Sequence, residues 1–171
     1  THDALKYARW TGSVWVSETA DGARGVGAYT SLALDADGNA HISYFDSANK
    51  DLRYARWLTN TWVTQTVDSS GDTGYYTSLA LDANGDPRIS YYETVARRLK
   101  YARWSAGNWI TETVDGNVGG YTSLKLDGAG NPHIAYQNRY FDLMYARWTG
   151  AAWVTRTVDG GAYVGYYASL A

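Results

Sequence analysis

The amino-acid sequence predicts an all-β fold, a β-propeller built from four-stranded antiparallel blades. A unit of roughly 47 residues recurs along the 171-residue chain, and each of its segments is five or six residues long with alternating or β-branched side chains. Such segments between turn residues are typical of short strands. Apolar residues at helical spacing are absent. A unit of about 40–50 residues with four strands is the size of a propeller blade.

Four segments define the unit. Leu-x-Tyr-Ala-Arg-Trp begins at Leu5, Leu52, Leu99 and Leu143. A segment that starts with Trp (WVSETA, WVTQTV, WITETV, WVTRTV) begins at Trp15, Trp62, Trp109 and Trp153. The Ser-Leu-x-Leu-Asp segment begins at Ser31, Ser78 and Ser123, with a shortened copy at Ser169. The remaining segment (HISYFD, RISYYE, HIAYQN) begins at His41, Arg88 and His133.

Turn residues separate these segments. Asp37-Gly38, Asn84-Gly85 and Gly130-Asn131 each stand between two strand segments, as expected of tight hairpins. The Asp35–Asn39 run also resembles a calcium loop, because carboxylates at alternate positions suit a hard cation. We favour a hairpin that needs Gly or Asn at positive φ, because the third copy lacks the middle carboxylate.

The segments also suggest an order within each blade. Small residues in Ser78–Asp82 suit the crowded axis, so this type is assigned as innermost, followed by the His41, Leu52 and Trp62 types. Counting them gives 15 strands. The predicted parts are an incomplete blade at 1–20, blades at 29–67, 76–114 and 121–158, and an innermost strand at 165–171. The chain is out of phase with its repeat, so it forms part of a larger ring, an oligomeric ring or a small closed one.

Composition restricts the function. The formal net charge is −2, so no polycationic face for nucleic acid is expected. The sequence contains no run of 18 apolar residues, so no membrane span is expected. Without Cys, disulfides and thiolate metal sites are excluded. His41 and His133 lie two blades apart, too far to share a metal, and His2 lies near the chain start. We expect no cofactor and no metal. The chain begins with Thr1, so a matured or trimmed product is expected. Separately, we expect a secreted, extracellular or periplasmic protein.

The order of an inner strand ending in Asp, then x-x-Gly, then a second strand ending in an aromatic and an acid resembles NHL-type propeller blades. Gly-flanked Trp residues resemble the blades of bacterial and fungal propeller lectins. This resemblance covers the whole chain at the level of architecture. It implies a propeller and, for the lectins, an expected glycan-binding activity; a fold alone does not fix function.

Arg and Trp of the repeats are the candidate ligand-binding residues. A sugar stacks its apolar face on Trp while its hydroxyls accept hydrogen bonds from Arg. The set in inter-blade grooves is Arg9, Trp10, Trp15, Arg56, Trp57, Trp62, Arg103, Trp104, Trp109, Arg147, Trp148 and Trp153. The alternative is structural, with Trp packed between blades and Arg either paired with Asp35, Asp82 and Asp127 or lying over an aromatic face.

Departures from the repeat are the other candidates. Lys125 replaces Ala33 and Ala80 on the innermost strand, where a charge is costly unless it reaches a central channel or a carboxylate. No nucleophile-elbow sequence and no asymmetric acid–base pair is evident, so we expect no enzyme. The leading prediction is an extracellular binding module with lectin-like glycan binding. Alternatives are a structural or protein–protein interaction scaffold, with self-association through open blade edges, and, last, part of a propeller glycoside hydrolase.

Overall fold

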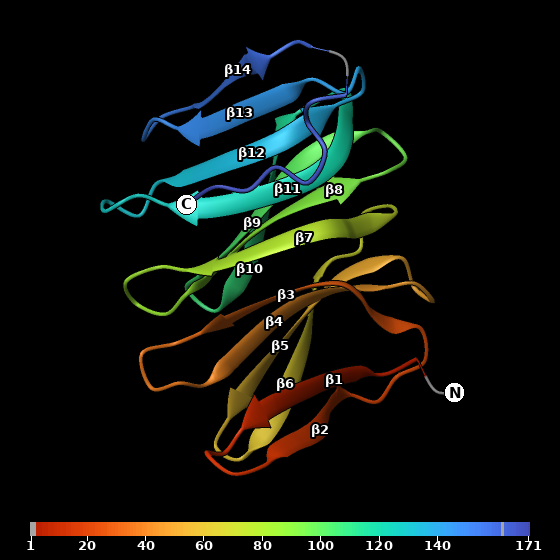
Figure 1. Cartoon of the computed structure of the whole chain (residues 1–171), viewed down its shortest axis with the longest axis vertical. Coiled ribbons are helices and arrows are strands. Elements are labelled where there is room, and N and C mark those ends of the chain that lie inside the picture. The colour runs from red at the N-terminus through yellow and green to blue at the C-terminus, as the bar shows by residue number, and fades with distance from the viewer. Residues whose placement is uncertain (1–2, 162) are drawn as a thin grey trace.

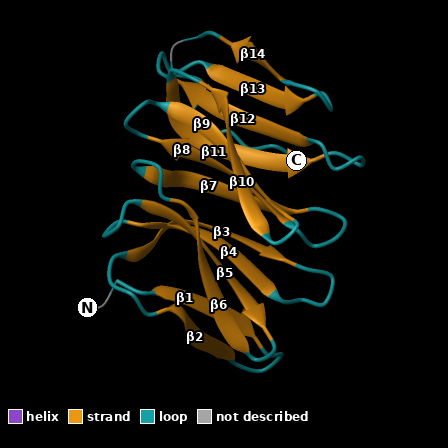
Figure 2. Cartoon of the chain, turned by 180° about the vertical axis from the view of Figure 1, so that it is seen from behind, coloured by secondary structure: helices purple, strands orange, loops and turns teal. Residues whose placement is uncertain are grey.

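The computed structural model describes residues 3–161 and 163–171, in which 14 strands form four antiparallel sheets (Figures 1 and 2). A two-stranded sheet contains β1 (Leu5–Trp10) and β2 (Trp15–Asp21). The first four-stranded sheet contains β3 (Val26–Leu34), β4 (Ala40–Asp46), β5 (Asp51–Leu58) and β6 (Thr61–Asp68). The second contains β7 (Thr73–Leu81), β8 (Pro87–Glu93), β9 (Arg98–Ser105) and β10 (Asn108–Asp115). The third contains β11 (Val118–Leu126), β12 (Pro132–Asn138), β13 (Leu143–Trp148) and β14 (Trp153–Asp159).

Each four-stranded sheet is a blade whose strands follow in chain order, as β3-β4-β5-β6 in the first. This confirms the order assigned from sequence. The blades succeed one another along the long axis of the molecule, and β3, β7 and β11 lie beside one another (Figure 1). No helix in the described ranges is long and apolar enough to cross a bilayer.

The predicted count of 15 strands is wrong. The segment from Ser169 lies against β11, and the Leu170 amide donates to Ser123 Oγ at 3.1 Å. It is not a strand, because each other innermost strand is hydrogen-bonded to the second strand of its own blade. This segment has no such neighbour among the described residues, and without a ladder an extended chain does not become a β-strand.

The Asp-rich turns are structural hairpins. Asp35 Oδ1 accepts hydrogen bonds from the Asp37 and Asn39 amides at 3.0 and 2.8 Å, and the turn places Gly38 at φ 80°. Asp82 and Asp127 repeat these bonds in the next two blades. The carboxylates therefore organise their own turns, as the hairpin interpretation predicts.

Neighbouring blades are joined at their innermost strands by side-chain hydrogen bonds that repeat along the chain. The Leu79 amide donates to Ser31 Oγ at 3.0 Å, and Thr77 Oγ1 donates to the Tyr29 carbonyl at 2.9 Å. Leu124 and Thr122 make the same two bonds one blade later. Because the backbone of one blade bonds to the hydroxyls of the next, the spacing of the inner strands is fixed.

A second set of contacts joins the blades farther from the axis. Tyr44 Oη donates to Asp21 Oδ2 at 2.6 Å, and Tyr91 does the same to Asp68. Asp68 also receives the buried Lys100 ammonium. Burial alone raises the pKa of Asp68, but hydrogen bonds from Lys100, Ser70 and Tyr91 outweigh it and lower this pKa below its usual value.

The third copy of this contact has no cation. Tyr136 Oη donates to Asp115 Oδ2, but Met144 stands where Lys100 stands in the preceding blade. Replacing Asp68 breaks an ion pair as well as a hydrogen bond, whereas replacing Asp115 breaks only a hydrogen bond. Comparing the two variants therefore separates the two energetic costs.

Replacing Asp68 with Ala is expected to lower the free energy of unfolding by about 3–5 kcal/mol, because Lys100 is left charged and buried. Asp115→Ala removes only an acceptor and should cost about 1–3 kcal/mol. Urea denaturation followed by far-UV circular dichroism measures both. Equal losses in the two variants would contradict the role given to Lys100.

Stability should also fall in acid. The pKa of Asp68 is lower in the folded chain than the value of about 3.9 expected when unfolded, so its stabilising contribution is complete above that value and is lost as the pH falls through the folded pKa. Hydrogen bonds from Asn131 likewise lower the pKa of Asp127 to about 2. Thermal melts between about pH 5 and pH 2 should show a declining midpoint, with a shallower decline in Asp68→Asn than in the exposed control Asp37→Asn.

Candidate functional site

Two cavities between successive blades, grooves I and III, carry the same types of side chain, and the repeat places a third set of these residues, groove II, between the first and second four-stranded sheets. Groove I lies between the β1–β2 hairpin and the first four-stranded sheet, and its principal residues are Tyr7, Arg9, Glu18, Asn39 and Trp57. Groove III lies between the second and third four-stranded sheets, and its principal residues are Tyr101, Arg103, Glu112, Asn131 and Trp148. By the repeat, groove II between the first and second sheets has Tyr54, Arg56, Gln65, Asp86 and Trp104.

Strand pairing sets the floor of each groove. In groove I, Tyr7 of β1 pairs with Glu18 of β2. Because side chains two residues apart share a face of a strand, Arg9 projects on the same side as Tyr7. The same register recurs for Tyr54 with Gln65 and for Tyr101 with Glu112.

The wall of each groove comes from the following blade. In groove I, Asn39 belongs to the turn before β4 and Trp57 to the end of β5. Arg9 therefore meets Trp57, which is 48 positions away, and not its sequence neighbour Trp10, whose side chain points to the other face. Groove III combines Arg103 with Trp148 in the same way.

The Trp residues of the outermost strands pack between blades. Trp62, Trp109 and Trp153 lie edge-on to Tyr7, Tyr54 and Tyr101, with ring centroids 5.3 to 5.4 Å apart. Each also packs against the Trp at the other side of its hairpin: Trp57, Trp104 and Trp148 respectively. Trp15, which no blade precedes among the described residues, is 70% exposed, and its hairpin partner Trp10 is 53% exposed.

The alternative in which the repeated Arg residues pair with the turn carboxylates is wrong. The structure pairs Asp35 with His41, Asp82 with Arg88, and Asp127 with His133. These partners come from the second strand of each blade, which starts just after the Asp turn. The repeated Arg of the third strand is left for the grooves. Both imidazoles are also bound through Nδ1 to a Tyr hydroxyl at 2.5 Å, Tyr54 for His41 and Tyr145 for His133.

Groove chemistry suits a neutral polyhydroxylated ligand. The cavities of grooves I and III are about 250 and 310 Å³. Each places a guanidinium donor, a carboxylate acceptor and an indole around one space, which are the groups that bind a hydroxyl-bearing ring with an apolar face. Burial raises the pKa of Tyr101 to about 12, so its phenol stays neutral beside Arg103.

The carboxylates Glu18 and Glu112 were not predicted as site residues. The signal is present in the outermost-strand segments, where the fourth residue varies as Glu18, Gln65, Glu112 and Arg156 while its neighbours hardly change. Arg147 and Arg156 of the last blade face no further blade among the described residues. The prediction for the Arg and Trp set remains untested as a ligand site.

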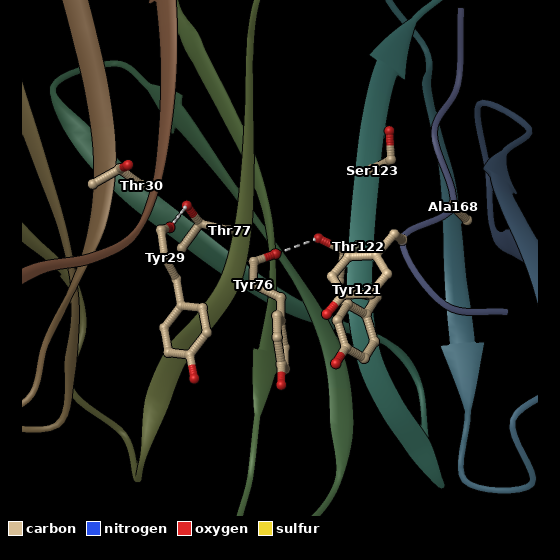
Figure 3. A pocket seen from close by; sticks show the side chains of 9 residues that line it. Tyr29, Thr30, Tyr76, Thr77, Tyr121, Thr122, Ser123 and Ala168 are labelled. Atoms are coloured by element: carbon tan, nitrogen blue, oxygen red, sulfur yellow. Dashed lines mark hydrogen bonds between the residues drawn. The ribbon is translucent and has the colours of Figure 1, made fainter.

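A row of tyrosines forms a separate cavity of about 610 Å³ where the innermost strands meet (Figure 3). The centroids of Tyr29, Tyr76, Tyr121 and Tyr167 follow one another at 4.8, 4.4 and 4.6 Å. All four have φ between 51° and 53°, at a cost of about 1–3 kcal/mol each. The bulge at Tyr29 turns its carbonyl toward Thr77, and Tyr76 does so toward Thr122 (Figure 3). Blade-to-blade bonding thus accounts for this backbone at Tyr29 and Tyr76.

Lys125 lies on the innermost strand β11 opposite His133 of β12. Its side chain is exposed, so the desolvation cost expected from its position does not arise. A role at a central channel stays a proposal.

Comparison with solved structures supports the fold. A fucose lectin from Kordia zhangzhouensis, solved with methyl-fucoside, matches 76% of this chain and 99% of its own at 20% identity, with a TM-score of 0.52. The lectin of Aleuria aurantia, described as a six-bladed β-propeller, matches 92% of this chain at 17% identity and a TM-score of 0.64. A polysaccharide lyase, an ulvan lyase, matches 81% at 15% identity and a TM-score of 0.58.

The chain spans about half the length of the last two proteins, 54% and 45%. At these identities the likeness establishes the β-propeller architecture predicted from the repeat. The resemblance to NHL-type blades remains a prediction. No family model matches the chain, and no curated protein matches its sequence.

Replacing Lys125 with Ala is expected to change the free energy of unfolding by no more than about 0.5 kcal/mol, because the ammonium is already in water. Chemical denaturation measures this change. A gain in stability above about 1 kcal/mol would show instead that the charge is held at a cost.

Proposed function

We propose that the chain is a non-enzymatic, lectin-like module that binds neutral sugars in its inter-blade grooves. One observation carries the proposal: grooves I and III, formed by different blades, present the same Arg, carboxylate and Trp around a cavity of sugar size. Repetition of a chemically mixed set is what several equivalent sugar sites require. An extracellular location goes with this role.

The structural relatives suggest fucose as the first ligand to test. Two of them are fucose lectins, one solved with methyl-fucoside and one described as having a novel fucose recognition mode. Fucose has one apolar methyl-bearing face and several hydroxyls, so it can stack on Trp148 while Arg103 and Glu112 bind its oxygens.

Methyl-fucoside should therefore bind, and Arg103→Ala or Trp148→Ala should weaken binding at groove III by about 10–100-fold, the loss of one charge-assisted hydrogen bond or stacking contact. Isothermal titration calorimetry gives affinity and site number. Arg24→Ala, in an exposed loop, is the matched control and should bind as the unchanged chain does. If a broad glycan array shows no binding by correctly folded protein, the proposal fails.

The polysaccharide lyase among the structural relatives makes carbohydrate cleavage the contrasting possibility. For glycoside hydrolysis, two carboxylates must act in two different roles. The groove carboxylates instead recur in equivalent positions from blade to blade. Turnover of a panel of chromogenic glycosides or of polyuronides would overturn the non-enzymatic part of the proposal.

A self-associating scaffold is a second candidate function, favoured by the exposed side chain of Trp15. Trp15 is 70% exposed, although each of its three counterparts packs on a Tyr of the preceding blade. Tyr145 of β13 is the Tyr of that type with no following Trp among the described residues. Trp15 of one copy fits Tyr145 of another by the contact seen three times within the chain.

On this second candidate, the chain should sediment as an oligomer, and Trp15→Ala should weaken association at least about tenfold because a buried Trp anchors interfaces. Val95→Ala, which alters an exposed apolar loop residue, should leave association unchanged. Sedimentation velocity over a concentration series makes the measurement. A chain that stays monomeric throughout the series would exclude the scaffold.

A further inference from the structure

The residues of the three grooves differ at two positions, one on the outermost strand and one in the turn, and the first difference concerns the acceptor that faces the ligand space. Grooves I and III have Glu18 and Glu112 on their outermost strands, whereas groove II has Gln65 at the same register position opposite Tyr54. Gln and Glu have nearly the same shape, so the difference is one of hydrogen bonding and charge. A carboxylate only accepts hydrogen bonds, but an amide has one accepting oxygen and one donating NH₂ group.

The accepting oxygen of Gln65 already takes one hydrogen bond from the protein. Trp109 Nε1 donates to Gln65 Oε1 at 3.0 Å. In grooves I and III the equivalent indole nitrogens, those of Trp62 and Trp153, are buried and have no hydrogen-bond partner in the described residues. Their Glu side chains therefore keep their oxygens for a ligand.

The bond from Trp109 changes which hydrogen-bonding groups groove II presents to a ligand. The Gln65 oxygen already accepts from Trp109 Nε1, so one of its two lone pairs is left, and the other end of the amide is a donor. Grooves I and III instead offer a charged carboxylate, whose hydrogen bonds are roughly twice as strong as those of a neutral amide. A sugar hydroxyl that donates toward this position is therefore held less tightly in groove II than in the other two grooves.

The opposite wall of groove II differs as well. Asn39 and Asn131 donate to the carboxylates of their own turns, Asp35 and Asp127. The Asp86 side chain has no donor to do this, although its backbone amide still binds Asp82, and the Arg88 side chain binds the turn carboxylate instead. Arg56 and Asp86 border a wider cavity of about 470 Å³ that they share with the Asp35 turn. The acceptor in groove II has thus moved from the strand to the turn.

We infer that grooves I and III form one class of sugar site, that groove II does not bind the same ligand, and that residue 65 decides the difference. The inference rests on the proposed sugar-binding function and adds a site number and a specificity-determining residue to it. The chain should then bind two molecules of methyl-fucoside, although it has three grooves.

Gln65→Glu is the decisive variant. It supplies two accepting oxygens, one for Trp109 and one for the ligand, and should raise the stoichiometry of methyl-fucoside in calorimetry from two to three. Glu112→Gln makes the reverse change and should lower it to one. Thr66→Glu adds the same charge to the neighbouring exposed position of β6, on the opposite face, and should leave two sites.

A site-resolved readout accompanies the titration. In protein labelled with 5-fluorotryptophan, methyl-fucoside should shift the ¹⁹F resonances of Trp57 and Trp148 but not that of Trp104; in Gln65→Glu it should shift all three. Three sites in the unchanged chain, or a Trp104 shift equal to the others, would overturn the inference and leave the lectin proposal intact. Binding that is absent from all three grooves would overturn both.

Discussion

The hydrogen bonds between innermost strands are the constraint on which the rest of the structure depends. A Ser hydroxyl of one blade, such as Ser31, accepts a hydrogen bond from a Leu amide of the next blade. A Tyr carbonyl of the same blade accepts a second hydrogen bond, from a Thr hydroxyl of the next blade. These bonds use backbone groups, so they fix both the spacing and the rotation of successive sheets. The positive φ of Tyr29 and Tyr76 is a consequence, because the bulge at each turns its carbonyl toward the neighbouring blade.

Fixed blade spacing creates the grooves. A Tyr of one blade and a Trp of the next meet edge-to-face at nearly one distance in all three copies, while the Asp–Tyr contact holds the outer strands together. Between these two contacts a space remains that neither blade fills alone. Arg and the acid or amide come from one side, Trp and the turn from the other. The binding surface is therefore a product of packing between repeats.

Repetition also makes the exceptions informative. Met144 in place of a cation, Gln65 in place of an acid and Lys125 in place of Ala each stand at a position whose surroundings are otherwise constant. The first lies opposite Tyr136 and leaves the part-buried Asp115–Tyr136 bond without a cation, so its effect is expected on stability. The second lies in a groove and changes its hydrogen-bonding character. The third reaches water, so its surroundings impose little on it.

Sequence by itself determined the strands, their order within a blade and the Asp-Gly hairpins, because these depend on local alternation and turn chemistry that each copy repeats. It also singled out the repeated Arg and Trp residues, Arg103 and Trp148 among them, as candidate ligand-binding residues. Only the tertiary structure decided that Arg103 meets the Trp of the following blade, that Glu112 completes the set, and that the final segment at Ser169 forms no strand. Consecutive residues on a strand face opposite sides, so the groups that share a groove are far apart in the chain and are brought together only by blade packing.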